Sequence, residues 1–195
     1  MFKRKKKTKE GLSWYDVTLD QFQRMRGLDK DDMGDQIEAA SILLGSYVND
    51  LTWGEFCREL LKLDFLKEEM PKTIIRKSYE LNGRIYETKA NLQDLSVTRY
   101  MDFMNQVKTG KLERILSVVL IPEGKEYGTY DMDQVYEDIL TMSAVDATAV
   151  YNFFLVQFIV CIKTMKDFSV DLLKGNPELQ GLVSGLMESY SMSDL

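Results

Sequence analysis

Histidine is absent from this sequence of 195 residues, and cysteine is scarce. Histidine is the commonest general base and the commonest metal ligand in proteins. Its absence excludes catalysis by a Ser-His or a Cys-His pair. No other pattern indicates a catalytic residue, a metal site or an organic cofactor. We therefore predict a protein that is not an enzyme and that has no cofactor.

The two cysteines, Cys57 and Cys161, lie far apart, and each sits within an apolar helical pattern. This placement favours buried free thiols over a disulfide and fits a reducing compartment. We expect neither thiol to act as a nucleophile.

Long apolar runs are also lacking. The longest covers residues 149–162 and is interrupted by Asn152 and Gln157. A helix needs roughly 20 predominantly apolar residues to cross a bilayer. We therefore predict a buried core helix and no membrane span.

The sequence contains no complete phosphate-binding or calcium-binding motif. The two glycines of segment 124–130 lack an accompanying Gly-Lys-Ser/Thr or G-x-G-x-x-G pattern, which predicts a plain turn. The aspartates of segment 29–35 do not match the spacing of an EF-hand loop. We expect a solvated acidic loop there.

Basic residues are concentrated at the N-terminal end of the sequence. Six of the 25 lie in the first nine positions, which leaves 19 against 31 acidic groups and a formal charge of −12 on the remainder. We predict a flexible basic arm over residues 1–13 and no secretory signal, because no apolar segment follows the basic run. The candidate residues for contact with a polyanion or a partner are Lys3, Arg4, Lys5, Lys6, Lys7 and Lys9. A solvated terminus is the alternative, and any nucleic-acid contact should be weak and confined to this arm.

Helical periodicity dominates the remainder of the sequence. We predict a mainly α fold, with a single helical domain over residues 14–174, and a flexible tail or short docking helix over 175–195. Five to seven helices should gather around a central buried C-terminal helix at 144–165. The predicted core includes Phe56, Leu60, Tyr100, Phe103, Leu116, Phe153, Phe154 and Phe158.

Helix ends can be assigned from capping residues. Thr18 and Ser96 are placed to cap helices, and Thr52 with Glu55 has the spacing of a capping box. Gly110 is placed to end the helix that begins after Ser96. A further helix is predicted over residues 33–48, although it contains Gly45.

One small β-hairpin is predicted at about residues 74–90. Asn82-Gly83 suits a two-residue type I′ turn, and the pattern places Tyr79 and Leu81 opposite Ile85 and Glu87. No third strand is predicted, so both edges of the hairpin should be open. Packing on the chain's own helices and addition of a strand from a partner are both consistent with this pattern.

The candidate residues for an edge-strand partner contact are Tyr79, Asn82, Gly83 and Tyr86.

The order of these elements resembles small proteins encoded among the structural genes of tailed bacteriophages, especially crAss-like phages. The segments that carry the resemblance are 14–22, 42–45, 81–86, 95–103, 115–122 with Tyr127, and 151–155. The likeness covers roughly residues 14 to 165 and leaves out the basic arm and the tail.

The resemblance implies a non-enzymatic virion component or tail-associated structural protein, with packaging inside the particle as one version. It also implies other phage structural proteins as partners, an oligomeric assembly, and a location in the virion or in the host cytoplasm during assembly. A transient tail-assembly chaperone is one alternative. A DNA-linked regulator that uses the basic arm is the second, although the acidic body and the lack of a recognisable helix-turn-helix weigh against it.

Overall fold

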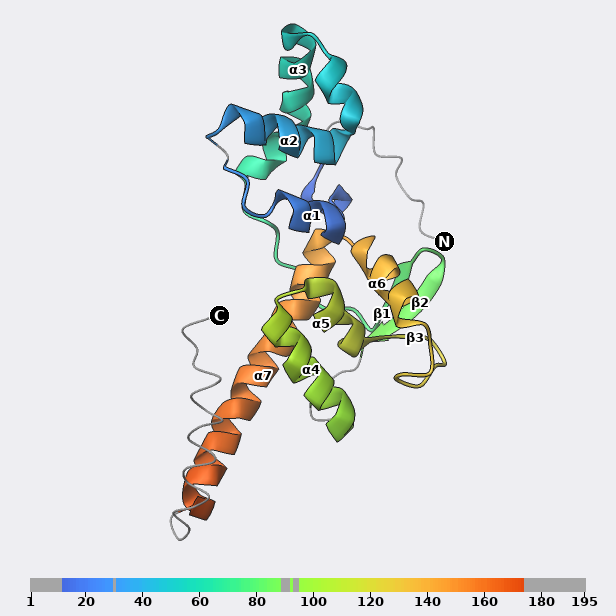
Figure 1. Cartoon of the computed structure of the whole chain (residues 1–195), viewed down its shortest axis with the longest axis vertical. Coiled ribbons are helices and arrows are strands. Elements are labelled where there is room, and N and C mark those ends of the chain that lie inside the picture. Colours follow the sequence, from blue (N-terminus) through green and yellow to red (C-terminus); the bar gives the residue numbers. More distant parts are fainter. Residues whose placement is uncertain (1–11, 30, 89–91, 93–94, 174–195) are drawn as a thin grey trace, which may run out of the picture. The chain divides into compact units, whose positions relative to one another are not determined.

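The computed structural model describes residues 12–29, 31–88, 92 and 95–173, with side chains described up to residue 161. The chain is mainly helical and carries one small antiparallel sheet, which confirms the predicted fold class (Figure 1). The α-helices are α1 Leu19–Met25, α2 Met33–Leu44, α3 Trp53–Leu60, α4 Val97–Thr109, α5 Leu112–Val119, α6 Met132–Leu140 and α7 Ala144–Leu173. The 3-10 helices are η1 Trp14–Asp16, η2 Ser46–Asp50 and η3 Leu61–Lys67.

The chain divides into two compact units, Met1–Phe153 and Phe154–Leu195. The division falls inside α7 and inside the range 14–174 that the sequence predicts as a single domain. Most of the basic arm and the tail at 175–195 lie outside the described residues.

The predicted caps form as expected. The Thr18 side chain accepts a hydrogen bond from the backbone N–H of Gln21 and begins α1. Thr52 and Glu55 form the capping box of α3. Ser96 caps α4, which ends at Gly110 in the left-handed conformation with φ of 66°. These local predictions are confirmed.

The helix predicted over residues 33–48 is two elements. Gly45 has φ of 110°, a conformation that ends α2 at Leu44, and the 3-10 helix η2 follows. Glycine adopts this backbone conformation without the steric cost that a Cβ atom would bring. The expectation that Gly45 sits within a continuous helix is therefore wrong.

The sheet has three strands and not two. Strand β1 (Ser78–Leu81) pairs with β2 (Arg84–Thr88), which pairs on its other side with β3 (Leu120–Pro122). The prediction of a hairpin without a third strand is wrong, because the apolar stretch after α5 leaves the helical conformation at Leu120 and hydrogen-bonds to β2.

The hairpin turn has the predicted residues in the predicted conformation. Asn82 and Gly83 both have positive φ, at 48° and 75°. This two-residue turn fixes the register, with Leu81 opposite Arg84 and Tyr79 opposite Tyr86. The predicted pairing with Ile85 and Glu87 is therefore wrong.

A short bridge connects the beginnings of α1 and α7. The backbone N–H of Leu19 donates to the carbonyl of Met142 at 2.7 Å, and the N–H of Ala144 donates to the carbonyl of Val17 at 2.8 Å. The flanking apolar side chains Val17, Leu19 and Met142 are all buried. The backbone pairing of the two segments is thus flanked by buried apolar side chains.

The predicted core residues are buried in most cases. Phe56, Phe103, Leu116, Phe154 and Phe158 are buried, whereas Leu60, Tyr100 and Phe153 are half-buried. The prediction of a core position is therefore too strong for the last three. Whether the helices gather around the C-terminal helix stays a prediction.

The cysteines are free, but they are not buried as predicted. Cys57 is exposed and Cys161 is half-buried. Cys57 follows the buried Phe56 on α3, so the two side chains point in different directions around the helix.

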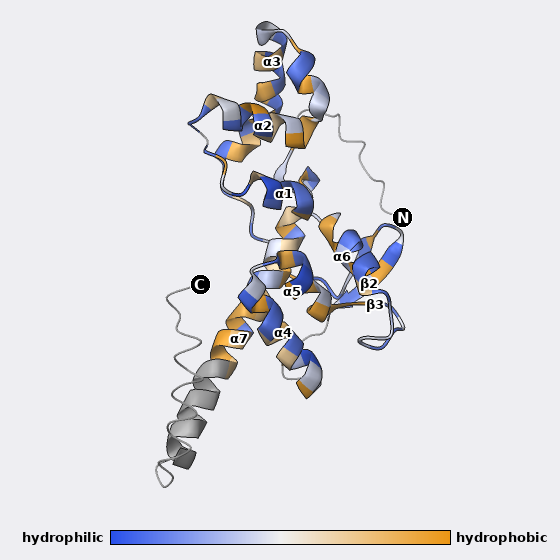
Figure 2. Ribbon diagram, in the orientation of Figure 1, coloured by the Kyte–Doolittle hydropathy of each residue, from blue (hydrophilic) through white to orange (hydrophobic). Residues whose placement is uncertain are grey.

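Apolar residues run along the part of α7 whose side chains the structure describes (Figure 2). Within the part of the chain that the structure describes, Ala144–Cys161 is a stretch of helix that is long and apolar enough to cross a membrane by length and composition, and 39% of it is buried. Core helices of soluble proteins have the same composition, so the absence of a membrane span stays a prediction.

Candidate functional site

The hairpin is held to α6 by a buried carboxylate. Asp138 is fully buried, and its Oδ2 atom accepts hydrogen bonds from the Tyr86 hydroxyl at 2.5 Å and from Nη1 of Arg84 at 2.6 Å. Its Oδ1 atom accepts from the side-chain amides of Asn82 at 3.0 Å and Gln134 at 3.1 Å. Four donors therefore converge on one carboxylate.

The charge of this carboxylate is stabilised by its donors. Burial acts to raise the pKa of Asp138, but the hydrogen bonds from Tyr86, Asn82 and Arg84 outweigh it, so the pKa is lowered. Burial and the neighbouring carboxylate raise the pKa of Tyr86. Asp138 is therefore an ionised acceptor and Tyr86 a neutral donor, and neither is prepared to transfer a proton near neutral pH.

Three of the four candidate residues in the hairpin have side chains that are buried or hydrogen-bonded within the chain. Tyr79 and Tyr86 are buried, and the Tyr79 hydroxyl accepts a hydrogen bond from the backbone N–H of Arg76 at 2.9 Å. Asn82 is engaged by Asp138, and Gly83 is exposed at the turn. The side chains of Tyr79, Asn82 and Tyr86 thus hold the hairpin within the chain. Strand addition at the backbone edge of β1 stays a prediction.

The other candidates from the sequence, Lys3, Arg4, Lys5, Lys6, Lys7 and Lys9, lie outside the described residues.

A second buried charge, which the sequence analysis missed, fixes the loop after β3. Arg99 on α4 is 4% exposed, and its Nε donates to the carbonyl of Val118. Its guanidinium lies 5.2 Å from the ring centre of Tyr127, whose hydroxyl donates to Asp102 at 3.1 Å. Burial lowers the pKa of Arg99 from its high ordinary value. An arginine on a helix is usually exposed, so the sequence offered no signal for this contact.

A third charged contact, between Asp146 and Arg76, is close to the beginning of α7. Asp146 is 7% exposed, and its Oδ1 lies 3.1 Å from Nη2 of Arg76. Burial raises the pKa of Asp146, and the guanidinium opposes this only in part. Folding therefore disfavours the ionised form of this carboxyl group.

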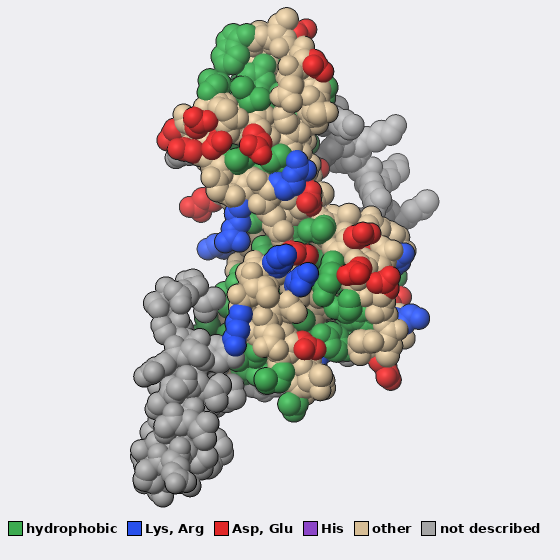
Figure 3. Space-filling view, in the orientation of Figure 1, with side chains coloured by type: hydrophobic (Ala, Val, Ile, Leu, Met, Phe, Trp, Pro, Cys, Tyr) green, Lys and Arg blue, Asp and Glu red, His purple; other side chains and the backbone are tan. Residues whose placement is uncertain are grey.

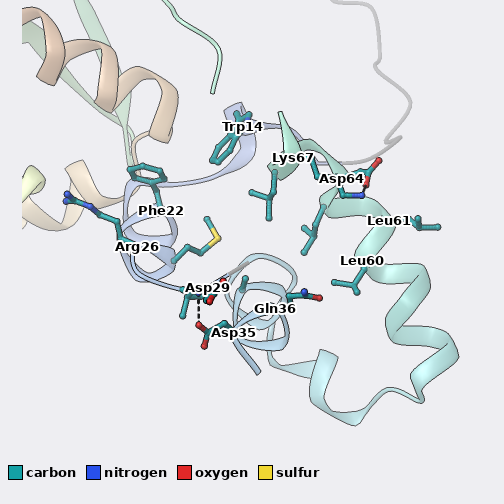
Figure 4. A pocket seen from close by; sticks show the side chains of 15 residues that line it. Trp14, Phe22, Arg26, Asp29, Asp35, Gln36, Leu60, Leu61, Asp64 and Lys67 are labelled. Carbon is teal, nitrogen blue, oxygen red and sulfur yellow. Dashed lines mark hydrogen bonds and ion pairs between the residues drawn. The ribbon is translucent and has the colours of Figure 1, made fainter. Parts of the chain in front are cut away.

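An open cleft of about 780 Å³ lies among α1, α2, α3 and the 3-10 helices η1 and η3 (Figure 4). Its lining is mostly apolar and includes Trp14, Phe22, Met25, Leu28, Ala39, Leu60, Leu61, Leu63 and Leu66. The charged and amide residues that line it are Arg26, Asp29, Asp35, Gln36, Asp64 and Lys67. Of the apolar lining residues, the sequence predicts only Leu60 as a core position, and its helical pattern does not indicate that these residues form a cleft.

The acidic loop predicted at residues 29–35 lies at this cleft. Asp35 Oδ2 accepts a hydrogen bond from the backbone N–H of Asp29 at 2.6 Å, and Asp32 caps α2 through the N–H of Asp35 at 3.0 Å. Asp31 and Asp32 are exposed. Figure 3 shows acidic side chains gathered on this part of the surface.

Among the residues that the structure describes, no group of three histidine, cysteine, aspartate or glutamate side chains is arranged to hold a metal ion. The buried charged groups Asp138, Arg99 and Asp146 each contact a neighbour in the chain, and none of the contacts given for the described residues sets a nucleophile beside a base. The cleft thus presents an apolar surface with acidic residues at its edge.

Comparison of the chain with protein-family models, with curated proteins and with solved structures finds no match in any of the three.

Proposed function

We propose that this protein is a non-enzymatic virion component or tail-associated structural protein of a tailed bacteriophage. The assignment to a phage rests on the sequence resemblance over roughly residues 14 to 165. The single structural observation that supports a binding role is the open apolar cleft between η1, α1, α2 and the α3–η3 segment.

The distribution of polar and apolar side chains supports a binding role over a chemical one. The buried carboxylate of Asp138 has donors on both oxygens, and the Arg99 guanidinium is covered by the protein. Leu61, which lines the cleft, has a side chain that is 72% exposed. Exposed apolar groups at the edge of a concave surface are typical of protein interaction sites.

The same cleft favours the transient tail-assembly chaperone as the second candidate. A chaperone holds an aggregation-prone partner through apolar surface and leaves before assembly is complete. Sedimentation of an infected-cell lysate separates the two functions. A virion component is expected in the fractions that contain complete particles, whereas a chaperone is expected only with assembly intermediates or unassembled protein. Absence from complete particles, from assembly intermediates and from complexes with unassembled structural proteins would contradict both.

The DNA-linked regulator is tested separately. The affinity for duplex DNA is measured against salt concentration for the full chain and for a chain lacking residues 1–10. A structural subunit should bind weakly, and the truncation should abolish that binding. Sequence-specific binding at moderate salt would instead support the regulator.

A further inference from the structure

We propose that the cleft binds an amphipathic helix of a partner protein, with an apolar face against its floor and basic side chains against its acidic edge. This inference rests on the proposed function, because it names the class of partner that a non-enzymatic assembly protein would bind.

The floor of the cleft is apolar and comes from several elements. Phe22 lies on α1, Ala39 on α2, and Leu60 and Leu63 at the junction of α3 and η3. Apolar side chains on a binding helix recur at i, i+3, i+4 and i+7, and they enter such a groove along one face. A cleft of about 780 Å³ lies within the range of sites that enclose several side chains.

The walls of the cleft are held by contacts within the chain. The indole N–H of Trp14 donates to the carbonyl of Glu68 at 3.1 Å. The Trp14 ring also packs edge-to-face against Phe65, with ring centres 5.4 Å apart, and against Phe22 at 6.4 Å. These contacts connect η1 to η3 and α1 across one side of the cleft. A partner would therefore enter a largely preformed surface, which reduces the entropy cost of binding.

The charge at the edge selects a basic partner. Asp29 and Asp35 line the cleft, and the exposed Asp31 continues the same loop. On the opposite element, Lys67 and Asp64 lie 2.6 Å apart and neutralise each other. Among the lining residues that the structure describes, Arg26 is the remaining cation, so acidic groups outnumber basic ones by one. Complementary charge would steer a cationic helix to this edge and repel an acidic one.

Binding of two synthetic peptides to the full chain tests the proposal. One is a 14-residue amphipathic helix of leucine and lysine, and the other replaces each lysine with glutamate. The dissociation constants are measured by fluorescence anisotropy at low and moderate salt. We expect the lysine peptide to bind at least tenfold more tightly than the glutamate peptide, with a preference that decreases as salt rises. Equal affinity for the two peptides, or no binding of either, would overturn the proposal.

Matched variants locate the binding surface. Leu61→Ser removes an exposed apolar side chain from the cleft lining, whereas Val97→Ser removes one that is 81% exposed on α4 and outside the lining. Both changes are at exposed positions, so both chains should fold, which circular dichroism checks. We expect Leu61→Ser to weaken binding of the lysine peptide about tenfold and Val97→Ser to leave it unchanged. Equal effects of the two would overturn the proposal.

The acidic edge has its own control. The double variant Asp29→Asn with Asp31→Asn lowers the negative charge at the cleft by two. Glu123→Gln with Glu126→Gln makes the same change in net charge at exposed positions outside the lining. We expect only the first pair of substitutions to weaken binding of the lysine peptide by more than fivefold at low salt. Equal loss in both would indicate attraction to the whole acidic body and would overturn the proposal.

The peptide experiment and the sedimentation experiment can fail independently. Peptide binding at the cleft with no association with phage particles would contradict the proposed function while leaving the binding surface established. Association with particles and no peptide binding would contradict only the inference about the partner helix.

Discussion

The phenolic oxygen of Tyr86 lies 2.5 Å from Oδ2 of Asp138, although the two residues are 52 positions apart in the sequence. This hydrogen bond joins the middle strand of the sheet to α6. Asn82 and Arg84, at and after the hairpin turn, bind the same carboxylate. The hairpin is therefore an anchored part of its unit, and its position depends on one buried acidic side chain.

Removal of the Tyr86 hydroxyl should destabilise the fold. Tyr86→Phe keeps the buried ring but deletes a hydrogen bond to an ionised group, and such bonds contribute about 1.5–3 kcal/mol. We expect the free energy of unfolding in urea to fall by about that amount. Tyr15→Phe, at a tyrosine that is 50% exposed, is the matched control and should have little effect. Equal stability of the two variants would contradict the role given to Asp138.

The two buried carboxylates should respond to pH in opposite directions. The pKa of Asp138 is lowered in the folded state, so its contribution to stability is present above its unfolded pKa of about 3.9 and is lost as the pH falls through its folded pKa. The pKa of Asp146 is raised, so its contribution is present below the unfolded pKa and is lost as the pH rises through its folded pKa.

Urea unfolding between pH 3 and pH 7 measures this difference. We expect Asp138→Asn to be less stable than the natural chain at pH 7, with a gap that narrows as the pH decreases. Asp146→Asn should be at least as stable as the natural chain at pH 7, with an advantage that also narrows in acid. A loss of stability at pH 7 in both variants, narrowing in acid in both, would be inconsistent with this assignment.

A side chain at the second position of the hairpin turn should destabilise the fold. Gly83 has φ of 75°, and a Cβ atom there would meet no other atom within 4 Å, so the cost of Gly83→Ala is purely conformational. We expect the free energy of unfolding of Gly83→Ala to fall by about 1–2 kcal/mol. Gly54→Ala is the control, because Gly54 lies in α3 and its Cβ would also meet nothing. The free energy of unfolding of Gly54→Ala should rise by about 0.5–1 kcal/mol.

Phe154 should contribute strongly to stability. Its side chain is fully buried, and Phe154→Ala should cost about 3–5 kcal/mol. Val156→Ala on the same helix removes a side chain that is 61% exposed and should cost far less. A loss near zero for Phe154→Ala would instead place this residue on a surface that faces a partner.

Local signals in the sequence predicted local structure well. The caps at Thr18, Thr52 and Ser96 and the positive φ at Asn82 and Gly83 depend on a few neighbouring residues, so they can be recognised from the sequence alone. The end of α2 at Gly45 was missed because apolar periodicity continues to Val48, while the glycine conformation interrupts the helix.

Contacts between distant segments were not predictable in the same way. The third strand at Leu120–Pro122 follows directly from a helix and is recognised only by its pairing with β2. The burial of Asp138 and Arg99 depends on which helices and loops cover them, and a charged residue on a helix is usually exposed. The cleft arises from side chains of five elements, so no single segment indicates it.

We propose above that the protein is a structural component of a phage particle. Quantitative mass spectrometry of purified mature particles, compared with the infected-cell lysate, tests it most directly. We expect the chain to be present in the particles in a fixed ratio to the known structural proteins. Its presence in the lysate and absence from mature particles would contradict the claim.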